Sequence, residues 1–310
     1  MVKIREIKPG DNHVDFNAIV LNVVNGKTNK APYLSIIFQD NSGTIDAKLW
    51  AATPEQIETI TTGKVVRVVG DAIKYNDNVQ LKINRIEVIS DKESEQVKYL
   101  KSAPVSSKDM EAFFRQTISQ IENSEIKIIV ETLINEQIEK FMIYPAASKN
   151  HHEYVSGLAY HTMSMLKLGL SICELYPSLN RDLIIAGVML HDLGKTIELS
   201  GPIVPEYTLE GKLLGHISIA QSMIEVTAKN LNITSEIPVL LKHMVLSHHG
   251  KLEYGSPVLP LIKEAEILSL IDNIDARMNT LDKTLETIEP GNFSKRVFSL
   301  ENRAFYKPKL

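Results

Sequence analysis

The sequence predicts a chain of two unlike domains, a small all-β barrel followed by an all-α bundle. Three observations predict this class. The chain has 310 residues, which suits two domains better than one. Residues 1–90 contain short runs of branched apolar residues separated by turn residues. After about residue 90, apolar residues recur with the 3.6-residue period of helices.

The first ninety residues are expected to form five strands, with a short helix after the third. That order is typical of an OB-fold, a small barrel that binds oligonucleotides. The turn at residues 40–43 (Asp-Asn-Ser-Gly) supplies the residue types that a hairpin needs for positive φ. The expected strands are 14–24, 33–38, 45–50, 64–69 and 79–89, and the expected helix is 54–60.

The rest of the chain is expected to be helical. Its apolar spacing predicts helices at 110–120, 125–141, 158–176, 181–191, 214–230, 237–247 and 261–286. The expected divisions are a barrel at 1–90, a linker and start of the helical domain at 91–150, a helical core at 151–286, and a basic, aromatic tail at 287–310.

Composition excludes several classes of protein. The net charge of −4 argues against a basic nucleic-acid wrapper, although residues 291–310 carry five cations and one acid. The N-terminus has no apolar leader, and no run of about 18 apolar residues occurs, which predicts a soluble cytoplasmic protein without membrane contact. The only cysteine, Cys173, rules out an internal disulfide and is expected to be a small core residue.

Histidines gather in the helical part, where eight of the nine lie between residues 151 and 249. Two acids in this part of the chain are costly to bury unless paired or metal-bound: Asp192, which follows His191, and Asp272, which interrupts an apolar helix. Mixed His and Asp ligands with a bridging carboxylate suit a pair of Mn, Fe or Zn ions. The candidate ligands are His161, His191, Asp192, His216, His248, His249 and Asp272. His243 matches no ligand position and is expected to be structural.

These residues, in this order and with Lys195 in His-Asp-Leu-Gly-Lys, resemble the signature of the HD-domain metal-dependent phosphohydrolases. The His248-His249 pair resembles the two-metal branch of that superfamily. The resemblance extends further, to an OB-fold joined to such a domain. The segments PEYTLEGKLLGH (205–216), SHHG (247–250), YGSP (254–257) and ENRAFYKP (301–308) are similar to the YhaM-type 3′-5′ exoribonucleases of Gram-positive bacteria.

The resemblance implies a function and roles for the candidate residues. It implies hydrolysis of single-stranded RNA, and also of single-stranded DNA, to 5′-mononucleotides by two divalent ions, with manganese or cobalt preferred. A homo-oligomer is expected as well. The first ion would be held by His161, His191, Asp192 and Asp272, and the second by Asp192, His216 and one of His248 or His249. The catalytic residues would be Asp192, Lys195 and His249, and the further substrate contacts would be His152 and Asp275. Asp275 could instead orient a ligand.

The barrel is expected to hold the RNA by stacking and by basic contacts. Tyr33 and Tyr75 are the expected stacking residues, because they lie at loop edges, whereas Phe38 and Trp50 are expected in the barrel core. The expected phosphate contacts are Lys48, Arg67, Lys74, Lys82 and Arg85. The C-terminal tail is expected either to guide RNA or to pack on the bundle or on a neighbouring subunit.

Two other functions compete with this one. The first is a phosphohydrolase of nucleotides or cyclic dinucleotides, in which the barrel serves assembly. Cyclic-dinucleotide relatives carry Gly-Tyr-Pro after the histidine pair, and this chain has Gly255-Ser256-Pro257 instead. The second is a nucleic-acid-binding protein with a vestigial metal site, which the apparently complete ligand set disfavours.

Overall fold

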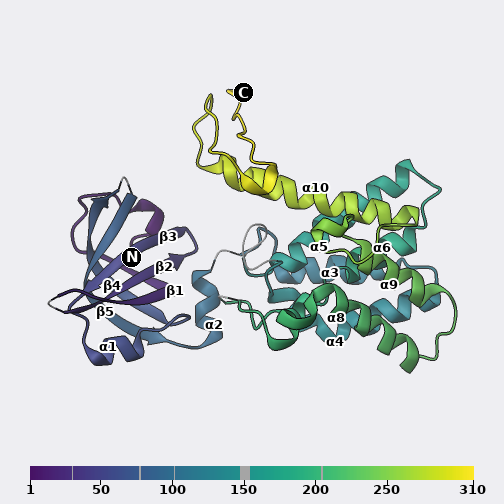
Figure 1. Ribbon diagram of the computed structural model, residues 1–310, viewed down its shortest axis with the longest axis horizontal. Coiled ribbons are helices and arrows are strands. Elements are labelled where there is room, and N and C mark those ends of the chain that lie inside the picture. The colour runs from purple at the N-terminus through teal and green to yellow at the C-terminus, as the bar shows by residue number, and fades with distance from the viewer. Residues whose placement is uncertain (30, 77, 101, 147–153, 204) are drawn as a thin grey trace. The chain divides into compact units, whose positions relative to one another are not determined.

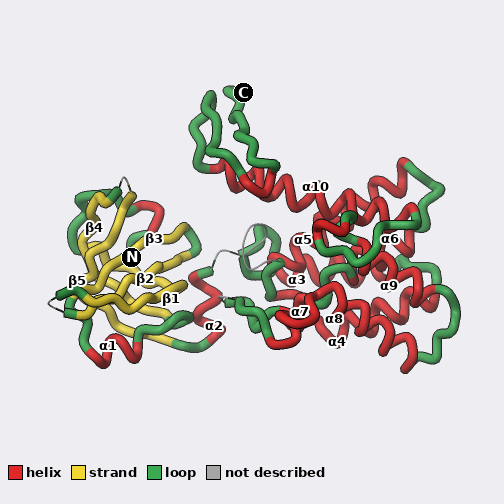
Figure 2. Tube along the Cα trace, viewed as in Figure 1, coloured by secondary structure: helices red, strands yellow, loops and turns green. Residues whose placement is uncertain are grey.

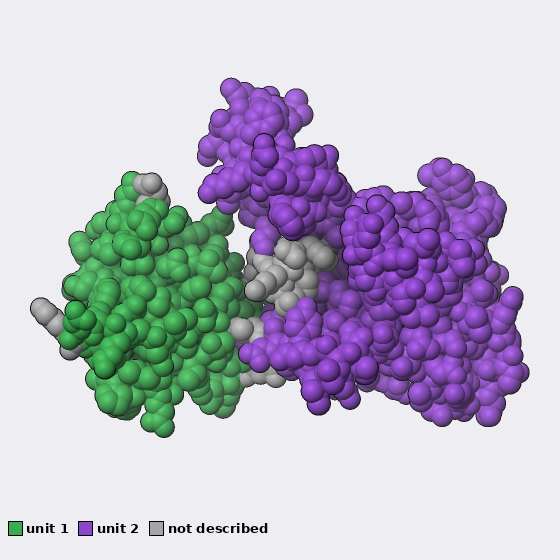
Figure 3. All heavy atoms as spheres, in the orientation of Figure 1, with its two compact units in different colours: residues 1–102 green, residues 103–310 purple. Residues whose placement is uncertain are grey.

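The computed structural model describes residues 1–29, 31–76, 78–100, 102–146, 154–203 and 205–310. The chain forms two compact units, residues 1–102 and 103–310 (Figure 3). The first unit is a β-barrel and the second is a bundle of helices (Figures 1 and 2). The predicted fold class is therefore confirmed.

Five strands close the barrel in the order β1-β2-β3-β5-β4. The pairing of β3 with β5 is parallel, and the other pairings are antiparallel. The short helix lies between the third and fourth strands, as expected. The elements are β1 (Val14–Lys27), β2 (Pro32–Asp40), β3 (Gly43–Trp50), α1 (Pro54–Thr59), β4 (Val65–Tyr75) and β5 (Asn78–Ser90), with η1 (Ile4–Glu6) before them and α2 (Glu93–Gln96) and η2 (Val97–Tyr99) after them.

The pleat of the strands decides which aromatic residues enter the barrel. Phe38 is fully buried and meets Phe16 edge to face, with ring centroids 6.2 Å apart. Trp50 is 49% exposed, so the expectation that it lies in the core is wrong. Because Leu49 points inward and side chains alternate along β3, its neighbour Trp50 must point outward.

In the second unit, the described helices surround one apolar helix, α6. Every residue from 183 to 190 in α6 is buried, because the run LIIAGVML has no polar face. Helices α5, α9 and α10 pack against it, which places its C-terminal end inside the bundle (Figure 1). The elements are α3 (Ser107–Ser119), α4 (Ser124–Ile143), α5 (Gly157–Leu175), α6 (Arg181–Leu190), α7 (Lys195–Glu198), α8 (Leu209–Asn230), α9 (Ile237–Ser247), η3 (Leu252–Tyr254), α10 (Lys263–Glu286) and η4 (Phe298–Leu300).

Two glycines shape the approach of α7 to α8. Gly215 has a φ of 72° and kinks α8, so that a new helical segment begins at His216. Gly194 lies so close to α8 that a Cβ atom there would collide with the main-chain carbonyl of His216. The glycine of His-Asp-Leu-Gly-Lys is therefore needed to bring His216 beside the end of α6.

The basic C-terminal segment packs on its own bundle. Isolated bridges pair Phe293 with Tyr306 and Val297 with Arg303, which makes residues 293–306 a hairpin. Arg277 of α10 donates two hydrogen bonds to Glu301 at the hairpin turn, with N–O distances of 2.7 and 3.0 Å. Within the described part of the chain, the helices are too short or too polar to cross a membrane.

Candidate metal centre

The ends and kinks of five helices bring the candidate ligands together. His161 lies in the second turn of α5, and His191 and Asp192 directly follow α6. His216 follows the kink of α8, and His248 and His249 follow α9. Asp272 comes from the middle of α10. A helical bundle builds metal sites in this way, from inward side chains on facing helices.

Asp192 lies at the centre of this group, and its two carboxylate oxygens face different histidines. Oδ2 is 3.4 Å from Nε2 of His191 and 3.9 Å from Nε2 of His161. Oδ1 is 3.5 Å from Nε2 of His216 and 3.8 Å from Nε2 of His248. These separations suit atoms that share an ion, since each ligand atom lies about 2.0–2.2 Å from a bound transition metal.

The two remaining candidate ligands, Asp272 and His249, lie on opposite sides of Asp192. Nε2 of His161 is 3.2 Å from Oδ1 of Asp272. His249 lies next to His216, with ring centroids 5.5 Å apart. Two sets of ligand atoms each lie within 4.8 Å of one another: His161 with His191 and Asp192, and His216 with His248 and His249. The structure thus brings together all seven candidate ligands.

The unpaired atoms of this site are the ones that a metal ion needs. Within the described residues, five buried side-chain atoms lack a hydrogen-bond partner, and four of them are Nε2 of His191, His216 and His248 and Oδ1 of Asp192. Buried polar atoms are seldom left unpaired, because desolvation without a new partner costs free energy. A divalent ion on each side of Asp192 would satisfy all four, so the residues present fit a metal pair.

The other ring nitrogen of each histidine explains why Nε2 is available. Nδ1 of His191 donates to the carbonyl of Val188 at 2.8 Å, and Nδ1 of His248 donates to that of Val245 at 2.7 Å. A carbonyl can only accept, so the proton is on Nδ1 and the lone pair is on Nε2. Such partners commonly orient metal-binding histidines.

The same arrangement recurs at His161, where a carboxylate takes the place of the carbonyl. Nδ1 of His161 is 2.7 Å from Oδ2 of Asp275. The structure therefore places Asp275 behind a ligand, where it orients the ring. His152, the other expected substrate contact, lies outside the described residues.

Burial and charge set the protonation of the site. Burial lowers the pKa of His248 well below its usual value and also lowers that of His249, which favours the neutral imidazole that binds metals. Burial opposes the charge on Asp192, but the Lys195 ammonium outweighs it and holds the pKa of the carboxyl well below its usual range. Burial also opposes a charge on His161, yet Asp272 and Asp275 raise its pKa to about 10. A metal ion at that position would take the place of the proton.

Lys195 approaches Asp192 rather than open solvent. Its ammonium lies 2.7 Å from Oδ2 of Asp192 and the residue is buried. Burial alone would lower its pKa, but the Asp192 carboxylate outweighs that effect and raises the pKa. Lys195 is therefore a fixed positive charge at the edge of the ligand set.

Sequence reasoning missed Glu198, which positions His216. Its Oε1 accepts hydrogen bonds from the main-chain N–H of His216 at 3.0 Å and from Nδ1 of the ring at 3.1 Å. Glu198 is buried, and it lies three residues after Lys195 in the same short helix, α7. No sequence pattern assigns this role, because Glu198 and His216 are 18 residues apart in the chain.

Replacing Glu198 by alanine should weaken metal binding on the His216 side of Asp192. The ring of His216 would lose its acceptor, and the loss of such an orienting partner typically costs about 10- to 100-fold in metal affinity. Titration of metal-free protein with Mn²⁺ in a calorimeter measures this loss. The exposed Glu206, substituted in the same way, serves as the control, and equal affinities for both variants would contradict the assigned role.

Two residues outside the ligand set behave as expected. His243 accepts a hydrogen bond from the main-chain N–H of Leu261 through Nε2, at 2.9 Å, which is a structural contact. Cys173 is buried in the apolar core of the bundle.

The barrel groups only some of its candidate RNA contacts. Tyr33 lies beside Trp50, with ring centroids 5.0 Å apart, and the Lys48 ammonium lies 4.9 Å from the centroid of the Tyr33 ring. Lys82 of β5 is the register partner of Lys48, which places both on one outer face. We call residues Tyr33, Lys48, Trp50 and Lys82 the barrel platform.

The other candidates lie elsewhere on the barrel. Arg67 pairs with Asp15 through two hydrogen bonds of 3.0 and 2.6 Å, on the β1–β4 side. Lys74 and Tyr75 are exposed at the end of β4, beside the turn to β5. Nη2 of Arg85 lies 3.5 Å from Oε2 of Glu87, so the two side chains form an ion pair. The barrel platform thus joins three of the predicted contacts, Tyr33, Lys48 and Lys82, to the exposed ring of Trp50.

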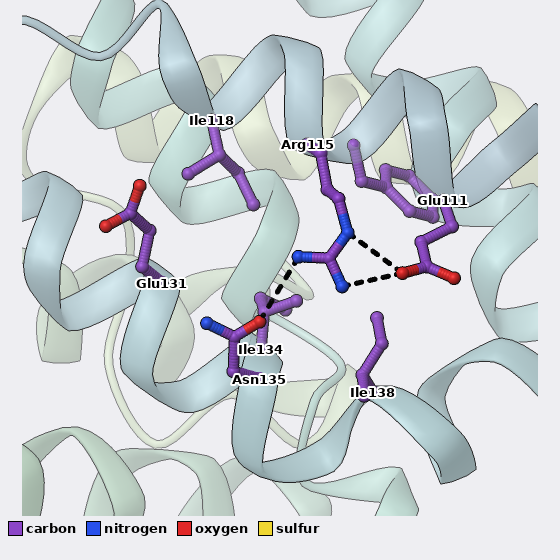
Figure 4. A pocket seen from close by; sticks show the side chains of 8 residues that line it. Glu111, Arg115, Ile118, Glu131, Ile134, Asn135 and Ile138 are labelled. Atoms are coloured by element: carbon purple, nitrogen blue, oxygen red, sulfur yellow. Dashed lines mark hydrogen bonds and ion pairs between the residues drawn. The ribbon is translucent and has the colours of Figure 1, made fainter.

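A pocket of about 150 Å³ lies between α3 and α4 (Figure 4). Its cation, Arg115, donates two hydrogen bonds to Glu111 and a longer one, of 3.5 Å, to Asn135. Because that charge is already paired and the lining includes no candidate ligand, the pocket offers no catalytic chemistry. Its lining residues are Glu111, Phe114, Arg115, Ile118, Glu131, Ile134, Asn135 and Ile138.

Comparison with known families agrees with both halves of the structure. Residues 17–89 match the model of the OB-fold nucleic acid binding domain, and residues 158–277 match that of the HD domain. The protein therefore joins an OB-fold barrel to an HD domain. A curated relative, the 3′-5′ exoribonuclease YhaM of Geobacillus sp. (strain WCH70), is 49% identical over 297 residues, which are 95% of this chain and 92% of the relative. The chain belongs to the YhaM family of 3′-5′ exoribonucleases.

Solved structures also align with the barrel. The second OB-fold domain of replication protein A from Methanococcus maripaludis is 20% identical and covers 29% of this chain and 94% of that domain, with a TM-score of 0.25. An OB domain from Thermoplasma acidophilum is 15% identical and covers 29% of this chain and 86% of its own, also with a TM-score of 0.25.

Proposed function

We propose that this protein removes nucleotides one at a time from the 3′ end of single-stranded RNA, releasing 5′-mononucleotides by two-metal hydrolysis. The observation that carries the proposal is the geometry of Asp192, whose two oxygens face two separate sets of buried imidazole nitrogens. Two-metal nucleases use such a shared carboxylate between ions about 3.5–4 Å apart. The family of the chain supports the direction of degradation and the RNA substrate.

Two groups of residues would hold the ions. His161, His191, Asp192 and Asp272 suit the first, and Asp192, His216, His248 and His249 suit the second. Bound ions would lower the pKa of water and stabilise the negative charge of a phosphodiester that is being hydrolysed. We propose Mn²⁺ as the preferred ion on the resemblance to the YhaM-type exoribonucleases, and Co²⁺, Fe²⁺ and Zn²⁺ as alternatives that mixed imidazole and carboxylate donors also admit.

The chain's own residues would orient the substrate. Lys195 presents a buried ammonium at the edge of the ligand set, where it is suited to neutralise a phosphate oxygen. His249 is held by two contacts, Nδ1 to the Tyr254 carbonyl at 2.7 Å and its main-chain N–H to Oγ of Ser256 at 3.1 Å. Its Nε2 is thereby fixed as a metal ligand or as a contact to the phosphate.

A direct test uses RNA labelled at its 5′ end. With Mn²⁺ present, we expect a ladder that shortens from the 3′ end and mononucleotide products, and a chelator should stop the reaction. Activity that survives the chelator, or release of the 5′ label as a mononucleotide before any shortened intermediates form, would contradict the proposal. A cyclic dinucleotide in parallel reactions tests the competing phosphodiesterase function, which expects turnover of that compound and none of RNA. Cleavage of single-stranded DNA, homo-oligomer formation and a cytoplasmic location stay predictions.

Replacing Trp50 by alanine should weaken RNA binding through the barrel platform. Trp50 is half exposed beside Tyr33, and loss of one stacking aromatic costs about 1–3 kcal/mol per base, or roughly 5- to 150-fold in affinity. Fluorescence anisotropy of a labelled oligonucleotide in the presence of a chelator measures this binding without cleavage. Ile89, also about half exposed on the barrel, is the control for substitution by alanine. Undiminished affinity of the Trp50 variant would exclude the platform from RNA binding.

A further inference from the structure

The loop after the histidine pair is folded tightly against His249. Residues 250–256 leave α9 and turn back, so that the carbonyl of Tyr254 accepts from Nδ1 of His249 at 2.7 Å. Oγ of Ser256 accepts from the main-chain N–H of His249 at 3.1 Å, and Ser256 is only 2% exposed. Gly250 and Gly255 make the two bends, with φ angles of +74° and +96°. The loop backbone is therefore fixed relative to the ligand set.

The same loop leaves an aromatic ring and a cation exposed. Tyr254 is 55% exposed, and the ammonium of Lys251 lies 5.4 Å from the centroid of its ring. A tyrosine ring lies within about 6 Å of its own carbonyl oxygen by covalent geometry, so this ring is no more than about 9 Å from Nδ1 of His249. That distance is comparable to the reach of one nucleotide. An ordered, half-exposed ring beside a ligand set is a surface on which an unpaired base can stack.

We propose that Tyr254 is a substrate-positioning residue that stacks on the base of one of the two nucleotides flanking the scissile phosphate. Lys251 contributes a positive charge to the phosphate on the 5′ side of that base. This inference rests on the proposed exoribonuclease function and assigns the RNA contact next to its metal centre. Stacking serves an enzyme that degrades RNA of any sequence, because every base has a π-face.

The pairing of Lys251 with Tyr254 has a simpler alternative role, which is to stabilise the loop that holds His249. The two roles differ in what they predict for Tyr254→Leu. The main-chain carbonyl that holds His249 is kept in this variant, while the flat ring is lost. A purely structural role predicts altered metal binding and an equal loss of activity on every substrate. A stacking role predicts unchanged metal binding and a loss that depends on the base.

A binding experiment tests stacking without cleavage. RNA carrying the fluorescent base 2-aminopurine at the 3′-terminal or the penultimate position is mixed with the whole protein in the presence of a chelator. We expect the wild-type protein to quench one of the two probes, Tyr254→Phe to preserve that quenching, and Tyr254→Leu to abolish it. Tyr176, equally exposed at the end of α5, is the matched control. Tyr176→Leu should leave quenching unchanged, since 15 residues of helix, or about 22 Å, separate it from His161.

A kinetic experiment assigns the contact to the base. Substrates lacking the base at one of the same two positions are compared with intact RNA at saturating Mn²⁺. On intact RNA, Tyr254→Leu should lose about 5- to 150-fold in kcat/KM, mainly through KM. For the wild-type protein, kcat/KM on one of the abasic RNAs should be lower than on intact RNA by a similar factor. For Tyr254→Leu, kcat/KM on that abasic RNA should be little lower than its own value on intact RNA. Elemental analysis should show equal metal content in both proteins.

The outcomes separate the two inferences. Equal quenching by wild type and Tyr254→Leu, or an equal kinetic penalty on intact and abasic RNA, would overturn the stacking role even if RNA is degraded as proposed. Quenching that depends on the Tyr254 ring in a protein that does not degrade RNA would overturn the proposed function and leave the stacking contact standing. Lys251→Gln adds a charge test. It should reduce the slope of log affinity against log salt concentration by the equivalent of about one phosphate contact. An unchanged slope would exclude Lys251 from the contact.

Discussion

Asp192→Asn should abolish exonuclease activity and prevent the binding of a metal pair. The carboxylate faces His191 and His161 with one oxygen and His216 and His248 with the other, so a single substitution affects both sides of the centre. The loss of a residue that only orients a ligand lowers metal affinity or activity by about 10- to 100-fold, and the loss of a shared ligand should lower them by more. Metal content by elemental analysis and shortening of 5′-labelled RNA measure the two effects.

The control for Asp192 is Asp282→Asn, at an exposed acid on α10. It should keep metal content and activity. Because the ammonium of Lys195 loses its 2.7 Å partner in the Asp192 variant, circular dichroism should accompany both proteins to verify that the bundle still folds. A folded Asp192→Asn protein that retains two metal ions and wild-type activity would place the catalytic site elsewhere.

Metal ions should raise the thermal stability of the helical unit and leave that of the barrel unchanged. An ion at 100 times its Kd stabilises the native state by about 2.7 kcal/mol. For a unit of 208 residues, residues 103–310, that corresponds to a rise in Tm of roughly 5–10 °C. The physical source is the set of buried nitrogen and oxygen atoms at the centre that lack a hydrogen-bond partner among the described residues.

The chain contains a probe for each unit. Its only tryptophan, Trp50, lies in the barrel, whereas ellipticity at 222 nm reports mainly on the helices. Adding Mn²⁺ to protein treated with a chelator should therefore raise the midpoint of thermal unfolding measured by ellipticity. The midpoint measured by Trp50 fluorescence should not change. In the Asp192→Asn protein, Mn²⁺ should leave both midpoints in place. A shift confined to Trp50 fluorescence would locate the metal in the barrel and contradict the proposed centre.

Local patterns in the sequence predicted much of this fold. The turn residues and branched apolar runs predicted the five strands, and the apolar spacing predicted the long helices within a few residues. The predicted helix at 214–230 corresponds to the part of α8 that begins at His216, and a short helical segment from Leu209, joined to it across the non-helical Gly215, was not predicted. Trp50 was misplaced although the alternation of β3 already assigned it to the outer face.

The candidate ligands were also accessible from residue type and spacing. Clustered histidines beside Asp192, and an acid at 272 in an apolar helix, are costly unless metal or a partner satisfies them. Of the groups that support these ligands, only Asp275 was proposed from the sequence. The carbonyls of Val188, Val245 and Tyr254 orient three rings, and a carbonyl belongs to every residue, so no sequence pattern identifies it. Glu198 became recognisable only once the kink at Gly215 brought His216 against it.

Residue type and periodicity thus suffice for the two domains, their order and the chemistry of the ligand set, since these depend on contacts between near neighbours in the chain. The partition of the ligands into two sets depends on contacts between distant segments, from His161 on α5 to Asp272 on α10. Packing around the apolar helix α6 decides which oxygen of Asp192 each histidine faces, and the folding of residues 250–256 decides that the carbonyl of Tyr254 meets the ring of His249. These positions are set by the packing of the core, because in a close-packed interior each side chain can occupy only the space that its neighbours leave.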